Sequence, residues 1–178
     1  MPVPGQWASR LLTRRAASLS APLLSTADCD PADLESALTR AGLPVSDLRE
    51  PGRRFFRFSD DKGLVGFAGL QGCGADRLLR SLVIMEERRN SGRGGAVVSA
   101  MEAAAIKDGA TALHLLTTGA RTFFAARGYE IRKRDRAPES IRGTREFTHL
   151  CPGSAAYMVK VLCAERPAAA RTTPRKAM

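Results

Sequence analysis

A glycine turn flanked by arginines is the stretch of this sequence best suited to binding a ligand. Residues 81–109 read as an apolar strand, a charged turn with closely spaced glycines and an alanine-rich helix, and Arg89 to Gly94 has the spacing R-x-x-G-x-G. Glycines let an anion approach backbone N–H groups closely, and a helix N-terminus directs partial positive charge at the same point. Arg88 and Arg93 add full charges, so the turn predicts a pyrophosphate site.

Two familiar nucleotide-binding turns fit this sequence less well. A Walker P-loop requires Gly-Lys-Ser/Thr, but here the turn continues Gly94-Gly95-Ala96, which excludes it. A Rossmann turn requires G-x-G-x-x-G/A directly after a strand and an acidic residue at the end of the next strand. Here polar and charged residues separate the strand from Gly92, and the next apolar run ends without an acid, so that alternative fits poorly.

The elements around the turn follow an α/β (α+β) order. Asp30 as N-cap, Pro31 at the first helical position and Gly42 as stop predict a helix, and 45–50 could add one more turn. The other expected elements are strands at 21–27, 53–58, 63–70, 77–84, 111–118, 129–134 and 154–162, helices at 95–108 (closed by Gly109) and 119–127 (ended by Gly128), and a helical turn at 137–144. The first half is an antiparallel meander and the second half is β-α-β-α-β.

Length and composition indicate one domain with basic ends. The chain has 178 residues, 44% hydrophobic and 26% charged, with a net charge of +10. More than half of that charge lies in residues 1–20 and 164–178. We therefore expect a disordered N-terminal extension at 1–20, a domain at 21–163 and a disordered basic tail at 164–178. The extension contains Arg and Ser and lacks acidic residues, as a transit peptide also would. A nucleic-acid partner is not expected, because the domain without its ends is only mildly basic and its sequence shows no interleaving of aromatic and basic residues.

Cysteine usage and hydropathy bear on the compartment. The cysteines at 29, 73, 151 and 163 show no C-x-x-C spacing and follow no secretory signal, which favours a reduced, cytoplasmic protein. No apolar run approaches the roughly 18 residues of a membrane span, so no membrane partner is expected. No ligand cluster has the spacing of a metal site, and a Ser-His-Asp arrangement cannot be assembled from the sequence.

Around the glycine turn, the sequence resembles the GNAT superfamily of acyl-CoA-dependent N-acetyltransferases. The family's first motif is a strand, then Q/R-x-x-G-x-G/A, then a helix, as found at 81–109. Its second motif, usually Y-x-x-x-G-F, would stand where "TFFAARGYEI" stands here. The resemblance covers most of 21–163. The stretches "GCGADRLLRSL" and "EFTHLCPGSAAYM" further resemble the arsenic-resistance (ArsN-type) members of the superfamily.

The resemblance implies a GNAT fold, with a mixed, mostly antiparallel, splayed sheet flanked by helices, and acetyl-CoA as co-substrate without a metal. The strand end would hold the pantetheine arm and thioester, amides of the turn would wrap the pyrophosphate, and the next strand and helix would form the opposite wall. The implied cofactor-binding residues are Leu82, Val83, Ile84, Arg89, Asn90, Ser91, Gly92, Arg93, Gly94, Gly95, Thr117 and Phe124. Asn90 replaces the family's usual glycine, a small loss because Asn tolerates a left-handed conformation. Glu86 stands where proline is frequent.

The match weakens at the catalytic acid. In many family members the Tyr of Y-x-x-x-G-F protonates the leaving thiolate, and that position is Phe124 here. No catalytic residue is therefore assigned, although a thiolate leaves tolerably without help or with water. Tyr129 is expected in the core. Thr117 could contact the cofactor or cap the following helix.

Residues on the acceptor side carry competing interpretations. Arg77 and Arg80 could form a surface strand face or bind a substrate carboxylate. Cys73 and Cys151 could contact a trivalent arsenical or be small packed residues. His114 is expected to be a buried structural residue rather than a base. Asp76 and Glu146 could act as bases, and the sequence does not distinguish them from solvated charges; nor can it place His149.

These observations predict an N-acetyltransferase that acetylates a primary amine of a small molecule. The ArsN-type resemblance makes an amino-acid-like or arsenic-containing toxic compound the leading acceptor class. The alternative is a catalytically weak, GNAT-like protein that binds acetyl-CoA for regulation. GNAT proteins often dimerise, so a homodimer is left open, but no interface signature is present.

Overall fold

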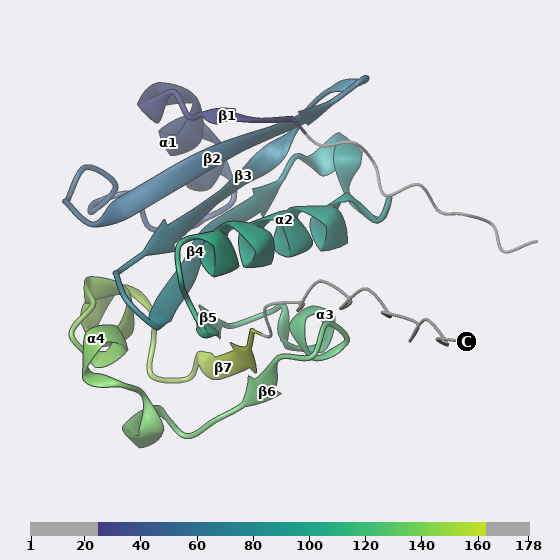
Figure 1. Cartoon of the computed structure of the whole chain (residues 1–178). Coiled ribbons are helices and arrows are strands. Elements are labelled where there is room, and N and C mark those ends of the chain that lie inside the picture. Colours follow the sequence, from purple (N-terminus) through teal and green to yellow (C-terminus); the bar gives the residue numbers. More distant parts are fainter. Residues whose placement is uncertain (1–24, 163–178) are drawn as a thin grey trace, which may run out of the picture.

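A computed structural model describes residues 25–162 of the chain (Figure 1). The expected extension at 1–20 and tail at 164–178 lie outside the described residues. Within the described range, no helix is long and apolar enough to cross a membrane.

One seven-stranded sheet organises the molecule, in the order β1-β2-β3-β4-β5-β7-β6. Neighbouring strands are antiparallel except β4 and β5, which are parallel. The strands are β1 (Ser25–Asp28), β2 (Arg53–Asp60), β3 (Gly63–Gln71), β4 (Asp76–Ile84), β5 (Ala112–Thr117), β6 (Glu130–Ile131) and β7 (Ala156–Val161). The predicted α/β class and mixed, mostly antiparallel sheet are confirmed.

Four α-helices and three short helical turns connect the strands. They are α1 (Pro31–Arg40), η1 (Glu86–Arg88), α2 (Arg93–Lys107), α3 (Arg121–Ala125), η2 (Arg134–Arg136), α4 (Glu139–Arg142) and the π-helix η3 (Glu146–Leu150). Asp30 caps α1 as predicted, because its carboxylate accepts a 2.8 Å hydrogen bond from the Ala32 amide.

Some expected boundaries were wrong. Helix α2 begins at Arg93, two residues before the expected start, because Gly92 with φ 78° already serves as its N-cap. Residues 45–50 form turns without a helix, and β6 comprises only Glu130 and Ile131.

The sheet carries different layers on its two faces. Successive residues of a strand point to opposite faces. Leu79 belongs to the main core with the α2 residues Val97 and Met101, whereas neighbouring Leu78 packs with Ile141 of α4. A third apolar cluster joins α1 to β3 and β4. Thus α2 covers one face, while α1 and α4 cover separate parts of the other, which leaves space for polar residues between them.

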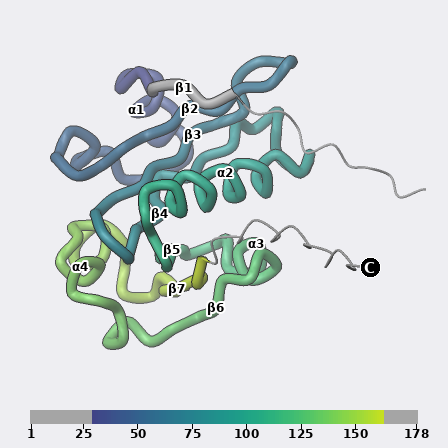
Figure 2. Tube along the Cα trace, viewed as in Figure 1, coloured from purple at the N-terminus to yellow at the C-terminus, as the bar shows by residue number. Residues whose placement is uncertain are grey.

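Strands β4 and β5 separate along their length, as the trace shows (Figure 2). Their pairing is limited to residues Asp76–Leu78 of β4, which lie opposite Ala112–His114 of β5. The register of β4 against β3 shifts between Phe67 and Gly69, and Ser81 there has a left-handed φ of 53°. Because a bulge bends its strand, this irregularity directs the end of β4 away from β5. The predicted splayed sheet is therefore confirmed.

Candidate functional site

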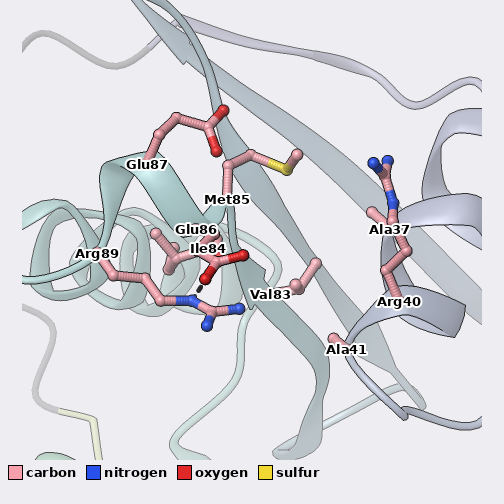
Figure 3. A pocket seen from close by; sticks show the side chains of 9 residues that line it. All are labelled: Ala37, Arg40, Ala41, Val83, Ile84, Met85, Glu86, Glu87 and Arg89. Atoms are coloured by element: carbon pink, nitrogen blue, oxygen red, sulfur yellow. Dashed lines mark hydrogen bonds between the residues drawn. The ribbon is translucent and has the colours of Figure 1, made fainter.

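A groove of about 590 Å³ opens where β4 leaves β5. Its walls come from the end of β4, the glycine turn, the start of α2, the region of α3 and the residues after α1. The lining residues are Ala41, Leu43, Leu82, Val83, Ile84, Arg89, Asn90, Gly92, Gly94, Gly95, Ala120, Phe123 and Arg127. A smaller recess of about 150 Å³, between α1 and η1, shares Ala41, Val83, Ile84 and Arg89 with it (Figure 3).

Close backbone approaches shape this groove. A Cβ atom on Gly66 would stand 2.1 Å from the Val83 carbonyl oxygen, so only glycine lets β3 lie this close to the bulged end of β4. A Cβ atom on Gly94 would meet the Phe123 ring at 3.3 Å. The first turn of α2 and the α3 wall are therefore in near contact, and a larger residue at Gly94 would push them apart.

The glycine turn presents the N-terminus of a long helix to the groove. Asn90 and Gly92 have φ values of 57° and 78°, so the expected left-handed conformation of Asn90 is confirmed. The first amides of any α-helix lack intrahelical carbonyl partners. Together with the helix dipole, they give this end of the groove an affinity for anions.

The arginines of the turn divide into two groups, which corrects the expectation that all of them face the ligand. Arg89 lines the groove, and its Nε donates to the Ile84 carbonyl oxygen at 3.2 Å (Figure 3). Arg88 and Arg93 instead pair with Asp60 of β2, the latter at 2.7 Å. Burial opposes ionisation of Asp60, but hydrogen bonds from Arg88, the Lys62 amide and Arg93 prevail and hold its pKa at about 2.

A basic residue that sequence reasoning missed lines the opposite wall. The Arg127 guanidinium lies 3.7 Å from the centre of the Phe123 ring, and its Nη1 donates to the Phe123 carbonyl oxygen at 2.7 Å. A Cβ atom on Gly95 would be 2.7 Å from Arg127 Nη2, so the guanidinium stands over the start of α2. In the part of the chain that the structure describes, no carboxylate pairs with Arg127 or Arg89. The available signal was the four-residue spacing of Phe123 and Arg127, which places them on one helical face.

Eight of the predicted cofactor residues line the groove and four do not. Those outside are Ser91, Arg93, Thr117 and Phe124. Ser91 Oγ donates to the Arg88 carbonyl oxygen at 2.5 Å, and Thr117 Oγ1 accepts from the Ala120 amide at 3.0 Å, which is the capping alternative. Phe124 is only 5% exposed and packs edge-on against Tyr129 in the core. Adjacent helical residues point about 100° apart, so Phe123 faces the groove instead.

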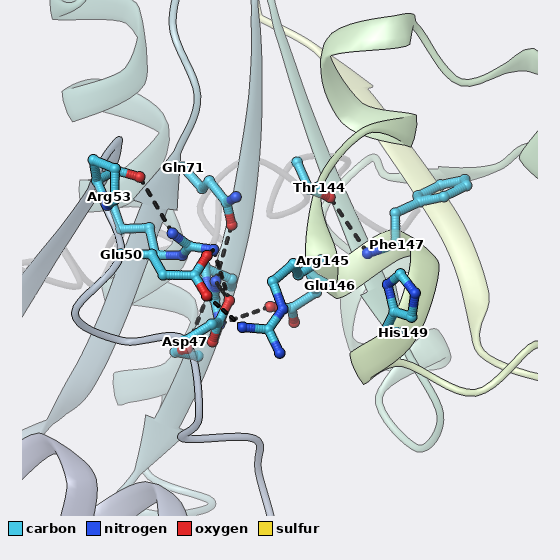
Figure 4. Close-up of polar contacts among 12 residues, drawn as sticks. Asp47, Glu50, Arg53, Gln71, Thr144, Arg145, Glu146, Phe147 and His149 are labelled. Atoms are coloured by element: carbon cyan, nitrogen blue, oxygen red, sulfur yellow. Dashed lines mark hydrogen bonds and ion pairs between the residues drawn. The ribbon is translucent and has the colours of Figure 1, made fainter.

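Asp47, Arg53, Arg80 and Glu146 form a charge junction on the sheet face that α1 and α4 cover. Asp47, Arg53 and Glu146 are labelled at this junction in Figure 4. Arg80 donates to both Asp47 carboxylate oxygens at 2.6 and 2.7 Å, and to Gln71 Oε1 at 2.9 Å. Its side chain is 1% exposed, so the expectation of a surface strand face for Arg80 is wrong. The neighbouring carboxylates and the amide oxygen of Gln71 make this burial tolerable.

The other acceptor-side candidates, Cys73, Arg77 and Cys151, lie in two separate places. Exposed Cys73 and half-buried Arg77 border a different hollow, of about 350 Å³, where Arg77 donates to the carbonyl oxygens of Gly72 and Asp108. Half-buried Cys151 donates to Glu146 Oε1 at 3.7 Å. Burial, and next the Glu146 charge, raise the pKa of the Cys151 thiol to about 11. The structure thus gives the two cysteines no shared contact.

The two expected core residues are confirmed. His114 is 3% exposed, with Nδ1 2.6 Å from Tyr157 Oη and Nε2 2.8 Å from Asp76 Oδ1. Burial, and next the Asp76 charge, raise the pKa of Tyr157 to about 12. Tyr129 is 2% exposed. Within residues 25–162, no group of His, Cys, Asp and Glu side chains could hold a metal ion.

Comparison with known proteins agrees with this architecture. Residues 51–131 match the family model described as acetyltransferase (GNAT) domain. No curated protein matches the sequence. The chain is similar in structure to N-acetylglutamate synthase from Neisseria gonorrhoeae complexed with coenzyme A and L-arginine, with TM-score 0.63 and 20% identity over 79% of this chain and 34% of that one. The chain therefore spans about a third of the length of that enzyme.

Two shorter structures match over more of their length. The protein Rv2747 from Mycobacterium tuberculosis, solved with CoA and NLQ, gives TM-score 0.64 and 16% identity over 78% of this chain and 99% of that one. A GNAT family N-acetyltransferase from Escherichia coli in complex with CoA gives 0.57 and 20% over 80% and 82%. The chain has the GNAT fold, and its residues 51–131 match the GNAT acetyltransferase domain model.

Proposed function

We propose that this protein is an acetyl-CoA-dependent N-acetyltransferase that acetylates a primary amine of a small molecule. The observation that carries this proposal is the groove between β4 and β5. It combines strand backbone, a helix N-terminus and the arginines Arg89 and Arg127, which have no acidic partner within the described residues. An elongated ligand with an apolar arm at one end and a diphosphate at the other matches that order of features. Solved relatives of the same fold contain coenzyme A.

Along this groove the pantetheine arm would run beside Leu82, Val83 and Ile84, and the pyrophosphate would meet the turn between Asn90 and Gly95. Arg89 and Arg127 would neutralise it from opposite walls, because neither is engaged by a carboxylate. Arg93, Ser91, Thr117 and Phe124 are not proposed as direct contacts, since each is directed elsewhere.

The transfer itself needs a neutral amine and a leaving thiolate. The amine nitrogen attacks the thioester carbonyl carbon, the C–S bond breaks, and the proton lost from nitrogen finally resides on the thiol or in solvent. Phe124 has no proton to give and lies in the core. The thiolate would therefore leave unassisted or with a water, which is consistent with a slow enzyme.

In this proposal the acceptor is an amino-acid-like compound. Its arsenic- or phosphorus-containing analogues are also candidates, because the sequence resembles the ArsN-type members. Direct capture of arsenic by Cys151 is disfavoured, because a thiolate is the ligand form and burial raises the pKa of this thiol to about 11. A cytoplasmic location is part of the proposal, and the free thiols of Cys29, Cys73 and Cys151 support it. A homodimer is not needed to complete the groove.

A second candidate function is a binding protein without turnover, which the position of Phe124 favours. Calorimetric titration with acetyl-CoA, followed by thiol-release assays over the amino acids and their arsenic and phosphorus analogues, separates the two. Binding with release by one amine supports the enzyme and identifies its acceptor class. Binding without release by any amine supports the regulatory protein, and absence of binding contradicts both.

A further inference from the structure

The charge junction is linked to the groove through β4, because Arg80 lies two residues before the groove residue Leu82. Arg80 directly precedes Ser81, where β4 bulges, and Leu82 after it lines the groove. Glu146 Oε2 lies 3.0 Å from Arg80 Nη2. The Glu146 carboxylate is therefore one guanidinium away from the point at which β4 separates from β5. Under the proposed function, this is the end that holds the thioester, where an acceptor amine must arrive.

Glu146 is the member of the junction whose hydrogen-bonding capacity is least satisfied. Asp47 takes both terminal nitrogens of Arg80, and Glu146 Oε2, although close to Arg80, accepts no aligned hydrogen bond. Its Oε1 receives only the Cys151 thiol, a weak donor, at 3.7 Å. The residue is 8% exposed, and carboxylates this buried normally accept several hydrogen bonds. Glu146 thus retains an acceptor site suited to an N–H donor.

We infer that Glu146 binds the ammonium group of the acceptor and removes its proton, with Arg80 as the residue that positions the carboxylate. This inference rests on the proposed function. An N–H bond of the ammonium breaks, its proton passes to Glu146, and the nitrogen lone pair forms the bond to the thioester carbon. The second nitrogen proton ends on the departing thiolate, and Glu146 returns its proton to solvent. Atoms and charge balance without a further reactant.

The groups around Glu146 suit this role. Arg80 of β4, Asp47 from the segment between α1 and β2, Arg53 at the start of β2 and the Cys151 thiol all act on it. Burial raises the pKa of Glu146, the Arg80 charge opposes this, and the Asp47 charge adds to it, so the pKa lies above its ordinary value. A carboxylate with a raised pKa is a stronger base near neutral pH. Figure 4 shows the segments carrying Asp47 and Glu146 facing each other across the junction.

Glu146→Gln tests the assignment, because it keeps the shape and removes the base. The assay uses the full chain, acetyl-CoA and the most active amine of the amino-acid and analogue panel, from pH 6 to pH 9. We expect kcat/KM for the amine to fall about 100-fold, the acidic limb of its pH profile to disappear, and acetyl-CoA affinity to remain unchanged. Hydroxylamine, which is already neutral at pH 7, should show a much smaller loss.

Glu102→Gln is the matched control. Glu102 is also a mostly buried carboxylate, 15% exposed, with one oxygen lacking a hydrogen bond and a cation, Lys160, at 2.7 Å, but it belongs to the other face of the sheet. The pH profile of kcat/KM in the Glu102→Gln variant should match that of the wild type. If Glu146→Gln lowers kcat/KM equally for the panel amine and for hydroxylamine, or lowers neither, the inference about Glu146 is overturned and the proposed function is not. A wild type that binds acetyl-CoA yet releases no thiol would overturn the proposed enzymatic function with it.

Glu146→Asp keeps the test decisive if the glutamine variant does not fold. A shortened carboxylate should lower kcat/KM while retaining the acidic limb, whereas a purely structural role would lower thermal stability and leave the pH profile unmoved. Side-chain carbon NMR of the wild type with bound acetyl-CoA supplies an assay that needs no turnover. Glu146 should titrate above ordinary glutamates, and a titration at the usual pH would contradict the assignment.

Discussion

Two arginine clusters flank the end of β4, and the protein uses them in opposite ways. At the glycine turn, Arg89 and Arg127 border an open groove, donate to backbone carbonyl oxygens and pair with no carboxylate among residues 25–162. At the charge junction, Arg80 and Arg53 are buried and bound to carboxylates. The first cluster holds charge available for a ligand, and the second neutralises its charge internally.

The difference shows that arginine content by itself does not locate a binding site. Arg88 and Arg93 belong to the same turn as Arg89, but Asp60 neutralises both. An arginine without an acidic partner contributes its full charge to an incoming anion, whereas a paired one must first lose a partner. Substitutions in the open cluster should therefore weaken binding, and those in the junction should weaken folding.

The largest effect is expected for Asp47→Ala. Removing this carboxylate leaves the guanidiniums of Arg80 and Arg53 buried without their shared partner, which should lower the free energy of unfolding by about 3–5 kcal/mol. Urea titration followed by circular dichroism measures this. The control Glu130→Ala breaks the exposed pair with Arg132 and should cost less than about 1 kcal/mol. Similar losses for both variants would contradict the contrast.

The next effect concerns Gly92→Glu, which brings a carboxylate to the expected pyrophosphate position. Coenzyme A affinity should fall about 100-fold or more, because like charges in near contact repel by a few kcal/mol. Gly92 has a φ of 78°, so Gly92→Ala carries the same backbone strain without the charge and serves as control. Calorimetric titration of both variants with coenzyme A measures the difference. Equal affinities would refute the site.

A smaller effect is expected for Arg127→Met, which keeps an aliphatic cover on Phe123 and removes the charge. Coenzyme A should bind about tenfold more weakly, as expected for loss of one charge-assisted hydrogen bond, with a shallower salt dependence. Dephospho-CoA separates the phosphates: an equal loss with it assigns Arg127 to the pyrophosphate, and a selective loss with coenzyme A assigns it to the 3′-phosphate. Arg93→Met, whose wild-type guanidinium faces Asp60, should change affinity less than about threefold. An equally large loss there would show that pairing does not matter.

The smallest effect is an acid dependence of stability carried by Asp60. Its pKa of about 2 lies below the ordinary 3.8, so its contribution is full above pH 3.8 and is lost as the pH falls toward 2. Asp60→Asn should lack this component in thermal unfolding measured from pH 5 to pH 2. The control variant Asp61→Asn, which changes the neighbouring exposed residue, should unfold with the same pH dependence as the wild type. A retained acid dependence in Asp60→Asn would assign it to other carboxylates.

Sequence patterns determined the parts of the site that depend on local backbone. The GNAT resemblance carried by R-x-x-G-x-G implied eight of the groove residues, and it could do so because glycine conformations, helix capping and the strand end are encoded within a few neighbouring positions. The same local logic placed the cap at Asp30 and the left-handed Asn90.

Only the tertiary structure decided which polar side chains remain available. Asp60, 28 positions before Arg88, neutralises part of the turn, and Asp47 and Glu146 meet at Arg80 from segments almost 100 residues apart. The short helix α3 turned Phe123 toward the groove and Phe124 into the core, a choice set by packing against Tyr129. Backbone conformation is a property of neighbouring residues, whereas the compensation of a charge depends on residues that meet only when the chain has folded.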